Sequence, residues 1–193
     1  GLLAIKTLGM GVISGILKER DENGEFINLQ DLCSRTAEIG VSKVSVEYLI
    51  KSGAFDGLGA NRRQMISNYE FLMDSASDFS KSNLDGQMGL FSEENSPTAV
   101  DVEFKPEEEY RYADLLCFEK FATGMYISGH PADPYKTALK LMHIPDALHV
   151  QSNLKEGAYT KNQVISFLGA MDDITVKYTS TGKKMGFLTL QDT

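Results

Sequence analysis

The 193-residue sequence contains only two cysteines and three histidines. Cys33 and Cys117 are far apart and form no Cys-x-x-Cys pair, so we expect buried free thiols rather than a disulfide or a metal site. His130, His143 and His149 share no metal-ligand spacing with one another or with a cluster of carboxylates, which argues against a zinc site. The residues therefore predict neither a metal nor a cofactor for this chain.

Long apolar runs are also absent. No run approaches the roughly 18 residues that span a bilayer, and the first residues do not have the form of a secretory signal. We therefore expect a soluble, cytoplasmic protein that contacts no membrane. The first three residues, Gly1-Leu2-Leu3, enter an apolar helical pattern directly, and we expect both ends of the sequence to lie within a longer chain.

Basic residues are outnumbered, 19 against 27 acidic ones, but the excess acid is local. Residues 1–66 carry 8 basic and 8 acidic side chains, residues 67–120 carry 4 and 13, and residues 121–193 carry 7 and 6. The two outer parts are thus balanced and compatible with binding to nucleic acid, although the net charge of −8 would hide this.

The N-terminal residues alternate between helical patterns and a glycine turn. Apolar spacing predicts a short helix over residues 2–6 and another over residues 12–20. Between them, Gly9-Met10-Gly11 makes positive φ available and leaves its outer face without side chains. Backbone N–H groups there can bind a DNA phosphate, with charge added by Lys6 and Lys18. This is the helix-hairpin-helix pattern, although an ordinary helical hairpin with a glycine cap would share it.

A second copy of this pattern follows. Asn28 is predicted to cap a helix to about residue 37, and an apolar face over residues 46–50 precedes the turn Ser52-Gly53-Ala54-Phe55-Asp56. The next helix opens with Asn61-Arg62-Arg63, and its predicted apolar face continues through Met65, Ile66, Tyr69 and Leu72. Paired units of this kind grip a duplex through backbone–phosphate contacts that are blind to sequence. We therefore predict a tandem helix-hairpin-helix domain over residues 1–74.

Residues 75–105 are rich in Ser, Asp, Asn and Glu, and we predict a mobile acidic tether because so little apolar surface cannot offset chain entropy. Its middle nevertheless contains Gln87-Met88-Gly89-Leu90-Phe91. Large apolar side chains in a tether have no core to join. They are therefore either incidental or destined for a pocket of another protein.

The remaining residues change from helical to strand periodicity. Pro106 and the glutamates at 107–109 predict the start of a long helix that ends at Gly129, within a helical connector over residues 106–160. A further short helix is predicted to end at about residue 142.

From residue 161 we predict the start of an OB-type domain. Alternating apolar residues indicate three strands over 164–170, 174–178 and 185–189, with a basic hairpin between the last two. Three strands can form only part of such a barrel, which binds single strands by charge and stacking. The fold class predicted for the whole chain is α+β, mainly α. The predicted DNA-binding residues are Lys6, Gly9, Met10, Gly11, Lys51, Gly53, Ala54, Arg62, Arg63, Lys183 and Lys184.

Together these segments resemble the C-terminal part of the alpha subunit of bacterial DNA polymerase III. Residues 1–11 resemble that family's first hairpin, and residues 49–56 resemble its second nearly residue for residue. Residues 118–131 resemble the segment that leads into the OB domain, and residues 182–192 resemble its early strands. The resemblance covers essentially the whole chain.

The resemblance gives the pentapeptide a role as the motif that binds the beta sliding clamp. It implies that Leu90 and Phe91 enter an apolar pocket of the clamp, that Met88 fills a second subsite and that the Gln87 amide binds at the rim. Gly89 departs from the more common Ser or Asp. The other implied partners are duplex primer-template DNA, the single-stranded template at the OB domain and further replicase subunits.

Catalysis is expected elsewhere. A DNA-directed DNA polymerase is a nucleotidyltransferase whose carboxylates hold two metal ions. The resemblance implies that these carboxylates and their Mg²⁺ belong to a palm that precedes Gly1 in the parent chain. No pair of acids in this sequence has such a context, so we predict no catalytic residue and no polymerase activity here.

Two other interpretations stay open. The chain could be a helix-hairpin-helix and OB module of a repair protein or nuclease, with the pentapeptide incidental. It could also be a purely structural helical connector, in which case it would not show salt-sensitive DNA binding.

Overall fold

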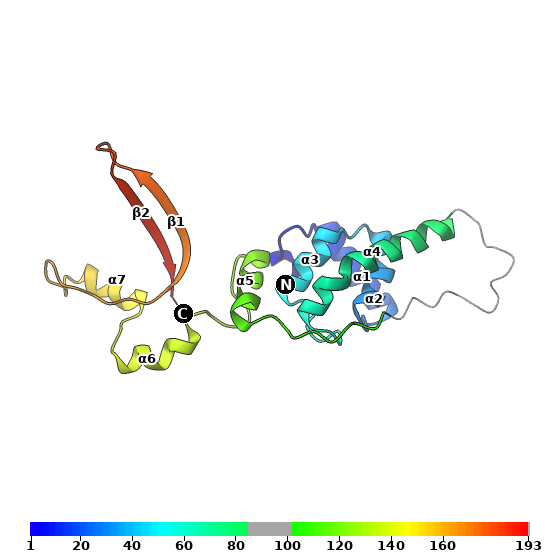
Figure 1. The fold of residues 1–193 in the computed structure, drawn as a ribbon, viewed down its shortest axis with the longest axis horizontal. Coiled ribbons are helices and arrows are strands. Elements are labelled where there is room, and N and C mark those ends of the chain that lie inside the picture. The colour runs from blue at the N-terminus through cyan, green and yellow to red at the C-terminus, as the bar shows by residue number, and fades with distance from the viewer. Residues whose placement is uncertain (85–101, 193) are drawn as a thin grey trace. The chain divides into compact units, whose positions relative to one another are not determined.

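The computed structural model describes residues 1–84 and 102–192. The chain forms two compact units, Gly1–Ile127 and Ser128–Thr193. Over the described residues the structure is mainly helical, with a small antiparallel sheet in the second unit (Figure 1), which agrees with the predicted class. Within these residues no helix is both long and apolar enough to cross a membrane.

Two helices of the first unit, α2 (Leu29–Thr36) and α3 (Lys43–Ser52), begin at residues whose polar side chains cap them. Asn28 accepts a hydrogen bond from the N–H of Asp31 (2.8 Å), and Ser42 accepts one from the N–H of Ser45 (3.1 Å). The predicted cap at Asn28 is therefore confirmed. The elements of this unit are η1 (Leu2–Ala4), α1 (Met10–Asn23), α2 (Leu29–Thr36), η2 (Ala37–Ile39), α3 (Lys43–Ser52), α4 (Arg62–Leu84) and α5 (Tyr112–Thr123).

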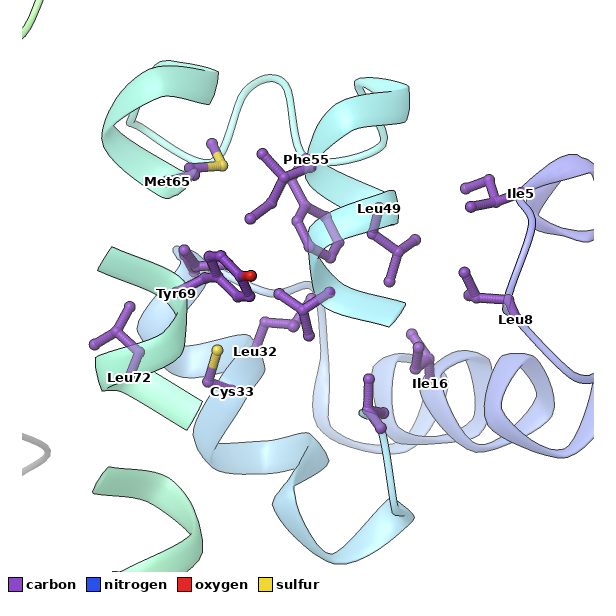
Figure 2. Packing of buried hydrophobic residues seen from close by; sticks show 14 of the residues in the cluster. Ile5, Leu8, Ile16, Leu32, Cys33, Leu49, Phe55, Met65, Tyr69 and Leu72 are labelled. Atoms are coloured by element: carbon purple, nitrogen blue, oxygen red, sulfur yellow. The ribbon is translucent and has the colours of Figure 1, made fainter. Parts of the chain in front are cut away.

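An apolar core joins α1, α2, α3 and α4 (Figure 2). Met65, Tyr69 and Leu72 recur at helical spacing on α4 and are buried, as the sequence predicts. They pack in the same cluster as Leu32 of α2 and Leu49 of α3, each 1% exposed. Burial of each such side chain stabilises the fold by about 1.5–3 kcal/mol. The core therefore fixes the positions of the helices that flank both glycine turns.

The two cysteines differ in their surroundings. Cys33 is 1% exposed in this core, and burial raises the pKa of its thiol to about 12. Cys117 is a free thiol on the surface of α5, so the predicted burial is wrong for this residue. The reason is its position on the helix, since the buried face of α5 consists of Leu116, Glu119 and Ala122.

α4 is longer than the sequence predicts. Residues 75–84 continue the helix, so the prediction that a tether begins at residue 75 is wrong for them. Their polar composition is tolerated because one face still packs, with Met73 and Ala76 against the core and the Ser80 hydroxyl 3.4 Å from a Glu38 carboxylate oxygen. The rest of the predicted tether up to residue 101 lies outside the described residues.

α5 begins at Tyr112 and ends at Thr123, so the predicted start at Pro106 and stop at Gly129 are both wrong. Gly124 takes φ 84° and donates its N–H to the carbonyl of Lys120 (2.8 Å), which ends the helix earlier. Residues 102–111 form neither helix nor strand, and Phe104 packs on the core.

The second unit contains η3 (Asp133–Tyr135), α6 (Lys136–Leu141), α7 (Ala147–Lys155), β1 (Ala170–Tyr178) and β2 (Lys184–Gln191). β1 and β2 pair antiparallel, from Ala170 opposite Gln191 to Tyr178 opposite Lys184, so the last two predicted strands are confirmed. The predicted strand over 164–170 is wrong, because the described sheet has two strands and Val164 is 91% exposed. A strand needs a partner for its backbone, and β1 is paired only with β2 in this sheet.

Candidate nucleic-acid interface

The first glycine turn leads into α1. Gly9 is the N-cap of this helix with φ −81°, and within the described residues no side chain caps it. The positive φ of the turn falls on Thr7 (72°) rather than on a glycine. A Cβ at Gly9 or Gly11 would meet no atom of the described structure within 4 Å. Neither conformation nor internal packing therefore requires glycine at these two positions.

Open glycines at a helix start leave room for a ligand to approach the backbone. The first N–H groups of a helix have no partner within the helix and form its positive end. Met10, the first residue of α1, is 61% exposed beside them. This arrangement is suited to an anion that approaches the N-terminus of α1 from solvent.

The second glycine turn has a structural reason for its glycine. Gly53 ends α3 with φ 81°, and its N–H donates to the carbonyl of Ile50 (3.0 Å). A Cβ on Gly53 would lie 2.2 Å from a terminal nitrogen of Arg62. Ala54, the next residue, is exposed. The two turns are near each other, because Met10 and Ala54 line the same apolar pocket.

Arg62 lies beneath the second turn, with its side chain only 7% exposed. Its guanidinium donates two hydrogen bonds to Asp56 (2.8 and 2.6 Å), one to Glu119 (3.1 Å) and one to the carbonyl of Lys51 (3.3 Å). The bond to Asp56 raises the pKa of Arg62 above its ordinary value. The Arg62 side chain, which was predicted to contact DNA, is thus hydrogen-bonded to acceptors within its own chain.

Glu119 is the acid that sequence reasoning did not single out. It is 1% exposed, and while one carboxylate oxygen accepts from Arg62, the other accepts from the N–H of Ile127 (2.8 Å). It therefore joins the second turn to the segment that follows α5. Its signal in the sequence is a single charged residue on the otherwise apolar face of a helix, and the partner cannot be read from local spacing.

The N-terminus of α4 is closed by a carboxylate from a distant segment. Glu109 accepts hydrogen bonds from the N–H groups of Arg62 (2.8 Å) and Arg63 (3.2 Å). Glu107 lies nearby, 3.5 Å from the guanidinium of Arg63. These glutamates were predicted to begin their own helix, and Glu109 does lie at a helix N-terminus, but that of α4. An external phosphate would have to displace it.

Two of the predicted lysines come together on one ring. The ammonium of Lys6 lies 5.8 Å and that of Lys51 lies 5.1 Å from the ring centre of Phe121, on α5. Lys6 also donates to the backbone carbonyl of Phe121 (2.8 Å), and Lys51 pairs with Glu47. The structure therefore places both lysines at the boundary between the glycine turns and α5.

Other predicted sites are separate from this arrangement. Lys183 and Lys184 stand exposed on the hairpin of the second unit, where the N–H of Lys183 donates to the Thr179 hydroxyl (3.0 Å). The pentapeptide predicted to bind the clamp, residues 87–91, lies outside the described residues. Across the parts of the chain that are described, no group of three or more His, Cys, Asp or Glu residues is arranged to hold a metal ion.

Residues 1–65, which include both glycine turns, match the helix-hairpin-helix motif family. DNA polymerase III subunit alpha of Borreliella burgdorferi is 33% identical over 195 residues, covering 100% of this chain and 16% of that protein. The subunit of Bacillus subtilis is 32% identical over 191 residues, with 99% and 16% covered. That of Deinococcus radiodurans is 34% identical over 203 residues, with 100% and 14% covered.

These relatives agree in name and in the share of their sequence that is matched. The chain spans about one-sixth of their length. These relatives belong to the same family that the hairpin residues, the second turn and the early strands were found to resemble. Over its whole length the chain belongs to the sequence family of the bacterial DNA polymerase III alpha subunits.

Proposed function

We propose that the chain is the DNA-binding and clamp-tethering region of a replicative DNA polymerase III alpha subunit. It holds duplex primer-template DNA through contacts to phosphates, without reading the sequence. The observation that carries this proposal is the open N-terminus of α1, where Gly9 and Gly11 have neither a conformational nor a packing role. The match to the helix-hairpin-helix family over residues 1–65 supports the same assignment.

The structure divides the residues of the proposed interface into two groups. Lys6, Met10 and Ala54 are exposed near the turns, so they belong to the surface that receives a phosphate backbone. Gly53 and Arg62 hold the second turn in shape from within. In the tandem arrangement proposed here, the first turn supplies backbone N–H donors. The second turn supplies an exposed surface next to these donors.

Lys6 provides a test of phosphate binding. We expect Lys6→Gln to weaken binding to a blunt duplex and to lower the slope of log affinity against log salt by about 0.9, because one fewer counterion is released. Fluorescence anisotropy over a range of salt concentrations measures both effects. Lys43→Gln is the matched control and should change neither the affinity nor the slope. Lys43 lies at the start of α3 and pairs with Asp74. An unchanged slope for Lys6→Gln would contradict the role of this lysine.

The clamp contact is proposed from the sequence of the pentapeptide at residues 87–91 alone, with Leu90 and Phe91 as its main apolar anchors. Two apolar anchors in one pocket are typical of interaction hot spots. Contact with DNA and with the clamp at the same time would raise avidity by on the order of 10²–10⁴. The combined contacts would keep a polymerase on its template.

Calorimetric titration with a bacterial beta clamp tests the tether. We expect heat of binding from the parent chain and none from Leu90→Ala/Phe91→Ala. Leu141→Ala/Met142→Ala is the matched control, because these neighbours are also large apolar residues that are exposed (76% and 70%). Equal binding by all three proteins would show that the pentapeptide is an incidental apolar cluster and not the clamp contact.

Residues 161–193, within the second unit, are proposed to be the start of an OB-type barrel that contacts the single-stranded template. Both strands of its hairpin expose large apolar side chains, among them Ile174, Phe187 and Leu190 at 55%, 50% and 44%. Such surface is normally covered by further strands. Lys183 and Lys184 at the turn supply positive charge for the template backbone.

The activity of the parent protein is proposed as DNA-directed DNA synthesis with Mg²⁺, in the cytoplasm and together with other replicase subunits. The chain itself contributes binding and no catalytic group. The alternative, a repair module that does not contact the clamp, has less support because each of the relatives described above is a polymerase subunit. Primer extension by the isolated chain should therefore be undetectable.

A further inference from the structure

An unbroken series of rings and cations crosses the first unit beside the glycine turns. Arg63 lies 5.7 Å from the ring centre of Tyr110, which meets the Phe118 ring edge-on at 4.9 Å. The ammonium of Lys51 follows at 5.6 Å from Phe118 and 5.1 Å from Phe121, and Lys6 is 5.8 Å from Phe121. The members of this cation–aromatic stripe, in spatial order, are Arg63, Tyr110, Phe118, Lys51, Phe121 and Lys6.

The stripe is assembled by the tertiary fold from five places in the chain, and Tyr110 comes from the segment before α5. Its cations come from the segment before α1, from the end of α3 and from the start of α4, whereas two of its rings come from α5. Phe121 is the most open ring, at 50% exposure. Tyr48 packs against it at 5.1 Å between centres and holds it in place. Packing of α5 onto α3 would not by itself require a half-exposed ring that is held between two ammonium groups.

The chemistry of this surface differs from that of the glycine turns. Backbone donors at a helix start fit the phosphates of a duplex, whose bases are stacked inside and cannot reach a protein ring. Aromatic faces alternating with cations fit unpaired nucleotides, because a base stacks on the ring while the neighbouring phosphate meets the cation. Both surfaces lie on one unit, and Lys6 stands between them.

We propose that the cation–aromatic stripe binds single-stranded DNA, with Phe121 as the ring on which a base stacks. The proposal rests on the DNA-binding function proposed above and assigns to the first unit a single-strand site distinct from the one proposed for the hairpin of the second unit. Glu47 and Glu107 neutralise part of the charge of Lys51 and Arg63. Stacking rather than charge must therefore contribute most of the selectivity for unpaired nucleotides.

Anisotropy with a labelled oligothymidine of about twelve nucleotides and, separately, with a labelled blunt duplex tests the proposal on the 193-residue chain. We expect Phe121→Leu, which keeps an apolar side chain, to weaken oligothymidine binding about five-fold or more and to leave duplex binding unchanged. Phe121→Tyr keeps the ring and should bind both as the parent does. Phe71→Leu on α4 is the matched control, since Phe71 is also exposed (59%) but belongs to no ring–cation pair among the described residues.

Each outcome decides the proposal. Loss of oligothymidine binding in Phe121→Leu alone supports it, provided that thermal unfolding shows the variant to be folded. Equal weakening of both DNA forms would assign Phe121 to the duplex surface and overturn the single-strand site. Unchanged binding by Phe121→Leu, or duplex binding without oligothymidine binding by the parent, would also overturn it. If the parent bound neither DNA form, the proposed DNA-binding function itself would fail.

Discussion

Gly11 is the residue at which an effect on stability can be separated most directly from an effect on DNA binding. It is the second residue of α1, and a Cβ built on it meets no atom of the described structure within 4 Å. Its φ is not positive, so alanine fits the backbone without strain. Glycine in a helix is less stable than alanine by up to about 1 kcal/mol. We therefore expect Gly11→Ala to stabilise the protein by about 0.5 kcal/mol, because the first turn gains only part of this amount.

The effect on DNA binding should have the opposite sign. A hydrogen bond from a backbone N–H to a phosphate needs the two heavy atoms about 2.9 Å apart, and a methyl group at Gly11 stands in that approach. Loss of one bond to a charged acceptor costs about 1.5 kcal/mol or more, which weakens binding about ten-fold. Urea unfolding followed by circular dichroism measures the first effect, and duplex anisotropy measures the second.

Gly15→Ala in the same helix is the matched control. There the new Cβ would lie 2.3 Å from a methyl carbon of Ile39, so the substitution overpacks the core. We expect a loss of about 1–3 kcal/mol in stability and, below the unfolding transition, no loss of affinity. The reasoning is refuted if Gly11→Ala binds duplex as tightly as the parent, because the glycine would then not be needed for access to the backbone.

Two further predictions concern the interior of the first unit. Glu119→Gln should destabilise the protein by about 3 kcal/mol in urea unfolding, because it leaves Asp56 as the only carboxylate paired with the buried charge of Arg62. Asp114→Asn on the surface is the control and should leave the unfolding midpoint unchanged. Equal effects of the two substitutions would contradict the role of Glu119 as a buried partner of Arg62. Iodoacetamide at pH 8.5 should add one adduct by mass to the native protein and two in denaturant, because the Cys33 thiol, with its pKa raised to about 12, stays neutral and enclosed. An unfolded thiol ionises near pH 8.5, so Cys33 should also lower stability as pH rises above that value; two native adducts would refute its burial.

Features that depend on neighbours in the chain could be predicted from the sequence. The cap at Asn28, the apolar face of α4 and the pairing of 174–178 with 185–189 follow from local spacing and turn chemistry, and the structure contains them. The first turn was predicted at Gly9-Met10-Gly11, but Met10 and Gly11 already belong to α1 and the positive φ lies at Thr7, so this prediction is only approximately right. These features need no knowledge of distant partners, because caps, helical periods and hairpins are satisfied within a few residues.

Features that depend on distant partners were decided only by the tertiary structure. A carboxylate favours the nearest helix N-terminus in space, so Glu109 closes α4 instead of beginning α5. A buried guanidinium must find acceptors, so Arg62 faces Asp56 and Glu119 instead of solvent. The sequence by itself determined the family, the second turn and the hairpin, since these depend on contiguous residues. Which cations remain exposed, and which rings lie beside them, depends on contacts between segments more than forty residues apart. Local patterns carry no information about such contacts.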